Sequence, residues 1–88
     1  MIVLDIKKRN REYGIITWAY SQDYDLMTLF NKSEYLDFEF EGKLFKNKKV
    51  SYKYRRFSIG KKRLESIKDF TKLSLIKKGK VILIKPIE

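Results

Sequence analysis

A basic stretch near the middle of the chain carries the residue types best suited to binding a polyanion. Residues 46–63 read KNKKVSYKYRRFSIGKKR, in which nine of the eighteen positions are Lys or Arg and none is acidic. Lys and Arg bind phosphates through charge and release the counterions condensed on a nucleic acid. The chemistry that this stretch offers is therefore phosphate binding.

The composition excludes most catalytic and metal chemistry. The sequence has no cysteine and no histidine, which removes disulfides, thiolate nucleophiles, imidazole acid–base catalysis and zinc sites built from these residues. A ribonuclease of the histidine-poor toxin type would use Lys, Arg and Tyr, but those proteins place two long helices after the first strand, where this sequence predicts a hairpin. We therefore expect a protein that is not an enzyme and that needs no metal or cofactor.

The net charge of +10 is unevenly distributed along the chain. Residues 43–85 contain sixteen basic side chains and two acidic ones, whereas residues 21–42 contain six acidic side chains and one basic. The basic half predicts a nucleic-acid partner, because a strong positive field attracts polyanions. The acidic segment 21–42 favours an alternative, in which the protein is an inhibitor or regulatory module, such as a small phage-type anti-defence protein, that binds a nucleic-acid-handling partner protein.

Length and hydropathy indicate one small basic domain over residues 1–88. No apolar run approaches the roughly 18 residues that a membrane span requires, and the apolar residues 1–4 are followed at once by Asp5. We expect a cytoplasmic protein without a membrane partner.

Alternation of apolar and polar residues predicts a mainly β fold. We expect a hairpin from residues 2–7 and 13–18. We also expect a closing hairpin from residues 73–76 and 81–84, which turns at Gly79, and Pro86 is expected to end the last strand. Apolar residues at every third position predict a short helix over 61–70. The fold class is thus a small antiparallel barrel of the OB/SH3-like kind with one short helix in its C-terminal half. Residues 26–30 favour a strand, and the alternative is an α+β fold in which residues 22–31 are helical.

Two further strands are predicted to be antiparallel neighbours. Residues 35–41 alternate apolar with acidic side chains, and residues 49–55 alternate apolar with basic ones, so the outer faces are complementary. If residues 42–48 form the connecting loop, Phe38 lies opposite Tyr52 and Asp37 opposite Lys53. The even-numbered tyrosines 52 and 54 are then expected in the core. The change of parity after residue 55 indicates a β-bulge or a strand end.

Several cations lack acidic partners in this register. Five of them are predicted to form one exposed patch where the strand leads through Gly60 into the helix: Arg55, Arg56, Lys61, Lys62 and Arg63. Aromatic residues beside cations could stack on unpaired bases, as Tyr13 could beside Arg11 and Phe57 beside Arg56. Trp18 is expected in the core. The candidate nucleic-acid-binding residues are Arg11, Tyr13, Arg55, Arg56, Phe57, Lys61, Lys62 and Arg63.

The order of motifs resembles cold-shock-type oligonucleotide-binding domains over about residues 2–57. Residues 11–17 (REYGIIT) are similar to the first RNA-binding motif of that family, and residues 29–34 (LFNKSE) to the second. Glu12 stands where the family has Gly, Ile15 replaces a stacking Phe, and Lys32 replaces His. The resemblance implies binding of single-stranded RNA or DNA, and the departures imply that binding depends on charge more than on stacking.

Overall fold

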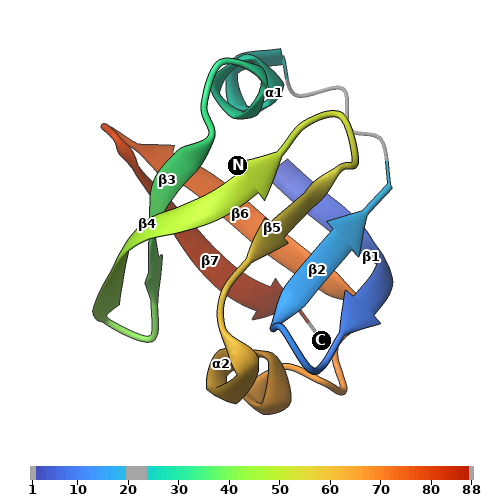
Figure 1. The fold of residues 1–88 in the computed structure, drawn as a ribbon. Helices are drawn as coiled ribbons and strands as arrows, with labels where there is room; N and C mark the ends of the chain where they lie inside the picture. The colour runs from blue at the N-terminus through green and yellow to red at the C-terminus, as the bar shows by residue number, and fades with distance from the viewer. Residues whose placement is uncertain (1, 20–23, 88) are drawn as a thin grey trace.

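Seven strands and two helices make up this protein, for which a computed structural model describes residues 2–19 and 24–87. The elements are β1 (Ile2–Asn10), β2 (Ile15–Trp18), α1 (Tyr24–Asn31), β3 (Tyr35–Phe40), β4 (Lys43–Ser51), β5 (Arg56–Ser58), α2 (Lys61–Ser66), β6 (Lys72–Lys78) and β7 (Val81–Ile87). The strands close into a barrel in the order β1-β2-β5-β4-β3-β7-β6 (Figure 1). The predicted mainly β barrel is confirmed.

Nearly all neighbouring strands of the barrel are antiparallel, and the exception is the parallel pair β3 and β7. The long strand β1 pairs with β6 through its first half and with β2 through its second, and its register with β2 shifts between Ile6 and Lys8. A closed barrel leaves no strand edge unpaired, which removes a common route to aggregation.

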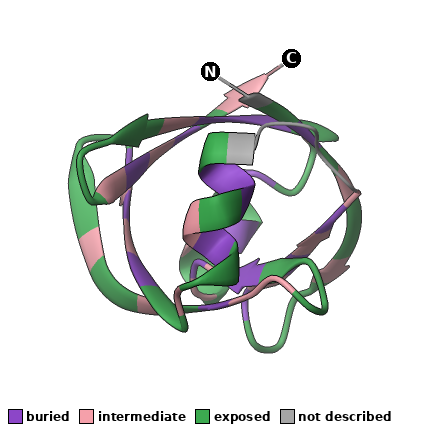
Figure 2. Ribbon diagram, turned by 90° about the horizontal axis from the view of Figure 1, so that it is seen from above, coloured by how far each residue is buried: buried purple, intermediate pink, exposed green. Residues whose placement is uncertain are grey.

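The predicted strand over residues 26–30 is wrong, because these residues belong to helix α1, as in the alternative with residues 22–31 helical. Leu26, Met27 and Phe30 are all buried, and helical spacing puts the three on one face, whereas a strand would send Leu26 and Met27 to opposite faces. Positions 22 and 23 of that alternative lie outside the described residues. Seen along the barrel, α1 lies over its open end (Figure 2).

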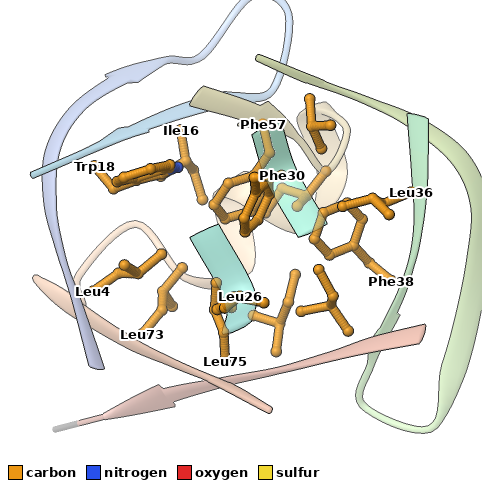
Figure 3. Packing of buried hydrophobic residues seen from close by; sticks show 14 of the residues in the cluster. Leu4, Ile16, Trp18, Leu26, Phe30, Leu36, Phe38, Phe57, Leu73 and Leu75 are labelled. Atoms are coloured by element: carbon orange, nitrogen blue, oxygen red, sulfur yellow. The ribbon is translucent and has the colours of Figure 1, made fainter. Parts of the chain in front are cut away.

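The core forms where α1 meets the inner face of the barrel. Phe30 of α1 is fully buried, and its ring centroid lies 5.8 Å from that of Trp18 and 6.2 Å from that of Phe57 (Figure 3). Phe57 also stacks on Phe38 with centroids 5.2 Å apart. The core position predicted for Trp18 is confirmed, at 1% exposure. A closed barrel of this size needs such large side chains to fill its interior.

β3 and β4 are antiparallel neighbours, as predicted, but the predicted register is wrong. Residues 43–48 are part of β4 and not of a loop, and Phe38 pairs with Phe45 and not with Tyr52. The reason is a two-residue turn at Glu41 and Gly42, whose φ angles of 53° and 77° suit a tight hairpin. Asp37 therefore does not face Lys53. Its Oδ1 accepts a hydrogen bond of 3.0 Å from the backbone N–H of Asn47, where β4 bulges with a φ of 56°.

The change of parity after residue 55 is a strand end. β4 stops at Ser51, residues 52–55 form a turn, and β5 begins at Arg56. Tyr52 is half-buried against the core, but Tyr54 is 57% exposed, so the core position predicted for Tyr54 is wrong. The turn is held by a 3.3 Å hydrogen bond from the Tyr54 N–H to the Ser51 Oγ and by a left-handed Arg55 with a φ of 52°.

The predicted helix after Gly60 and the predicted closing hairpin are present. α2 covers 61–66, followed by turns that place Ile67 in the core and Phe70 against it. β6 and β7 turn at Gly79, with a φ of 63°. Pro86 does not end β7; it lies beyond the pairing with β3, where β7 has one neighbour and Pro is tolerated. Among the described residues, neither helix is long and apolar enough to cross a membrane.

Candidate nucleic-acid interface

A groove of about 430 Å³ lies on the outer side of β2, β5 and β4. The described residues that line it include two exposed tyrosines, two cations and two serine hydroxyls, and none of these described residues is acidic. The lining residues are Tyr13, Ile15, Lys49, Val50, Ser51, Tyr54, Arg56, Phe57 and Ser58. We call this hollow the groove.

Strand register explains why Arg56 faces outward on the middle strand of this face. Arg56 of β5 pairs with Thr17 of β2 on one side and with Ser51 of β4 on the other. The next row along the strands joins Phe57 to Ile16 and Val50, and all three of those side chains are buried. Successive side chains of a strand point to opposite faces, so the row of Arg56 faces outward.

The turn between β4 and β5 brings an aromatic ring and two cations together at one end of the groove. The Arg56 guanidinium lies 4.8 Å from the centroid of the Tyr54 ring, and the Lys53 ammonium lies 5.5 Å from it. Cation–π contacts of this kind hold a flexible cation near a ring. Tyr54 remains 57% exposed, so its ring is accessible to a ligand.

Tyr13 occupies the other end of the groove, in the turn between β1 and β2, and is 63% exposed. The Asn10 Oδ1 accepts hydrogen bonds from the N–H groups of Glu12 (3.1 Å) and Tyr13 (3.3 Å), which fixes the turn. Gly14 then packs directly on Gly60, and its carbonyl accepts a 2.9 Å hydrogen bond from the Ile59 N–H. Tyr13 is therefore carried by a turn that is anchored to the segment before α2.

The structure brings some of the predicted site residues together and separates others. Tyr13 and Arg56 both line the groove, and Arg11 is exposed in the same turn as Tyr13. Arg55 lies in the turn before β5, at the end of the barrel near α1, where its carbonyl accepts a 2.8 Å hydrogen bond from the Trp18 N–H (Figure 1). The three cations of α2 lie at the far end of β5, so the expected single patch is divided between the two ends of that strand: Arg55 and Arg56 at one, Lys61, Lys62 and Arg63 at the other.

Phe57 is a correction to the predicted site. Its side chain is 1% exposed and stacks on Phe38 inside the barrel, so its ring cannot stack on a base. β5 starts a new alternation of side chains, which turns Arg56 outward and Phe57 inward. This new alternation explains the change of parity after residue 55.

Sequence reasoning missed Tyr54 and Lys49 as groove residues. The alternation over residues 49–55 predicts Tyr54 in the core because it extends past the end of β4, and it predicts Lys49 on the basic face opposite the acidic strand. In the observed register Lys49 pairs with Tyr35. The signal that could have found Tyr54 is Ser51, since a serine hydroxyl often accepts from the backbone of the turn that follows it.

The acidic strand β3 has basic side chains near it. β3 lies between the lysine-rich strand β4 and strand β7, which pairs with β6. A hollow beside β3 holds Asp37 together with three lysines, Lys32, Lys77 and Lys80. Asp37 thus lies near basic side chains of the same chain, and binding of a partner protein by the acidic segment 21–42 stays a prediction.

Over residues 2–19 and 24–87, no cluster of three or more acidic side chains is placed to hold a metal ion. The resemblance to cold-shock-type domains stays a prediction. Comparisons with protein-family models, with curated proteins and with solved structures found no match to this chain.

Proposed function

We propose that this protein binds single-stranded nucleic acid in the groove and does so without catalysis. The observation that carries the proposal is the pair of exposed tyrosines at the two ends of a groove that also contains Lys49 and Arg56 and whose described lining residues include no carboxylate. Aromatic rings stack on bases of any sequence, while Lys and Arg contact the phosphates between them.

An unpaired strand suits this surface better than a duplex. Stacking on Tyr13 and Tyr54 requires bases whose faces are free, and in a duplex those faces are covered by neighbouring base pairs. The resemblance to cold-shock-type domains supports the same proposal, since residues 11–17 of its first motif form the β1–β2 turn and β2, which border the groove.

The test is a fluorescence-anisotropy titration with single-stranded RNA, single-stranded DNA and duplex at two salt concentrations. We expect both single strands to bind more tightly than the duplex. Tyr54→Ala should weaken binding by about 5- to 150-fold, which corresponds to the roughly 1–3 kcal/mol of one base–aromatic stack. Arg56→Gln should flatten the log–log salt slope by about 0.7, the value for one phosphate of a single strand.

Tyr35→Ala is the matched control, because Tyr35 is 55% exposed, close to the exposure of Tyr54, and borders the groove as the cross-strand neighbour of Lys49 without lining it. It should leave affinity within about twofold, as expected for a side chain that makes no stack. Equal losses in the two tyrosine variants, or tighter binding of the duplex, would show that the groove is not the binding site for a single strand.

A further inference from the structure

A second hollow lies between the start of β4 and α2 and has a volume of about 320 Å³. The residues of its lining that the structure describes include three cations, one carboxylate and two aromatic rings. The residues are Phe40, Glu41, Lys43, Phe45, Lys62, Arg63 and Ser66. We call it the β4–α2 hollow.

Arg63 and Phe45 repeat the pairing of a cation with an aromatic ring that is found in the groove. The Arg63 guanidinium lies 4.1 Å from the centroid of the Phe45 ring, as Arg56 lies 4.8 Å from that of Tyr54. Both Arg63 and Phe45 are half-buried, so the guanidinium is held close to the protein surface. A guanidinium ordered in this way binds a phosphate with less loss of side-chain freedom than a mobile one.

The hollow and the groove are close enough to hold one strand. The β1–β2 turn that carries Tyr13 packs on Gly60 and on the backbone of Lys61, so the groove ends beside the first residue of α2. Lys62 and Arg63, the next two residues of α2, line the hollow. The whole molecule measures 27 × 24 × 22 Å, which keeps the two sites within the reach of a short oligonucleotide.

We propose that the β4–α2 hollow is a second phosphate-binding subsite, which contacts the same single strand where it leaves the groove past Tyr13. This inference rests on the proposed function. It extends that function by assigning Lys43 and Arg63 to the footprint and by predicting that they act only on strands longer than the groove. The net charge of the hollow, three cations against Glu41, favours a polyanion that spans both sites.

The experiment compares oligouridylates of about 4 and about 16 nucleotides, the range of site sizes for small single-strand-binding folds. In Lys43→Gln/Arg63→Gln, the salt slope for the long strand should flatten by about 1.4, twice the value for one phosphate, while binding of the short strand stays unchanged. Lys78→Gln, at the exposed end of β6, is the control for loss of a surface charge. Lys43→Gln alone, at an exposed position, keeps the test valid if loss of the Arg63–Phe45 contact disturbs folding, and it should flatten the slope by about 0.7.

Three results would overturn the inference. One is an equal loss of affinity for short and long strands, which would show that these cations act on a ligand in the groove and not on a longer strand that leaves it. Another is a flattening of the salt slope in Lys43→Gln/Arg63→Gln that is no larger than the flattening in Lys78→Gln. The third is competition by polyglutamate as strong as competition by the long RNA, which would assign the hollow to an acidic protein. Failure of the proposed function is seen separately, because the unmodified protein would then bind neither strand or would prefer the duplex.

Discussion

Replacing Gly14 by alanine tests the contact between the β1–β2 turn and α2 that positions Tyr13. A Cβ atom on Gly14 would lie 2.2 Å from the carbonyl carbon of Gly60 and 2.5 Å from the backbone nitrogen of Lys61. Ordinary carbon–carbon contact is about 3.5 Å, so the two backbones would have to separate by about 1.3 Å. Neither contacting atom belongs to a flexible side chain, and the strain cannot be relieved by a rotamer change.

The expected loss has two parts. Gly14 has a φ of 67°, and an L-residue with a Cβ loses about 1–2 kcal/mol in that left-handed conformation. Overpacking against a backbone adds about 1–3 kcal/mol. Gly14→Ala should therefore lower the free energy of unfolding by about 2–5 kcal/mol, a large part of the roughly 5–15 kcal/mol that stabilises a typical domain.

Gly79→Ala is the matched control, because Gly79 has a similar φ of 63° and no atom within 4 Å of the added Cβ. It should lose only the conformational part, about 1–2 kcal/mol. Urea and thermal unfolding measure both variants, and each kcal/mol should lower the Tm by about 4–8 °C. Equal losses in Gly14→Ala and Gly79→Ala would refute the close packing of the turn on Gly60.

Two further predictions concern the elements that shape the barrel. Phe30→Ala should lower the free energy of unfolding by about 3–5 kcal/mol, because Phe30 is fully buried where α1 closes the barrel. Thr28→Ala, on the exposed side of α1, is the control and should change the free energy of unfolding by less than about 0.5 kcal/mol. Equal losses of the two variants in urea unfolding would contradict the position of α1. Asp37→Ala should lower the free energy of unfolding by about 0.5–1.5 kcal/mol, because the Asn47 N–H loses its acceptor. Asp37→Asn keeps an acceptor oxygen and should retain most of the stability. Equal free energies of unfolding for the Ala and Asn variants would show that the hydrogen bond does not hold the β4 bulge.

The local patterns of the sequence determined much of the barrel. Strict alternation in residues 35–40 predicts a strand with one buried face, and Leu36, Phe38 and Phe40 are buried. Gly79 between two apolar runs predicts the closing hairpin, because glycine adopts the left-handed turn conformation without strain. These features depend on neighbours along the chain, so they can be read without knowing the fold.

Tertiary packing decided the elements with weak local signals. The apolar run at 26–30 is too short to distinguish a helix from a strand, and the open end of the barrel selects the helix by burying Leu26, Met27 and Phe30 together. The β3–β4 register depends on a left-handed Glu41, a conformation uncommon for a residue with a side chain, so the longer loop was predicted instead.

For the candidate site too, some features follow from the sequence and others only from the fold. The sequence alone determined the excess of Lys and Arg and the absence of His and Cys, and from these the expectation of phosphate binding. Only the fold could show that Tyr13 and Tyr54, forty-one positions apart in the chain, lie on one groove while Phe57 is buried. The physical reason is that strand pairing β2–β5–β4 joins distant segments side by side, and the end of each strand decides which side chain faces outward.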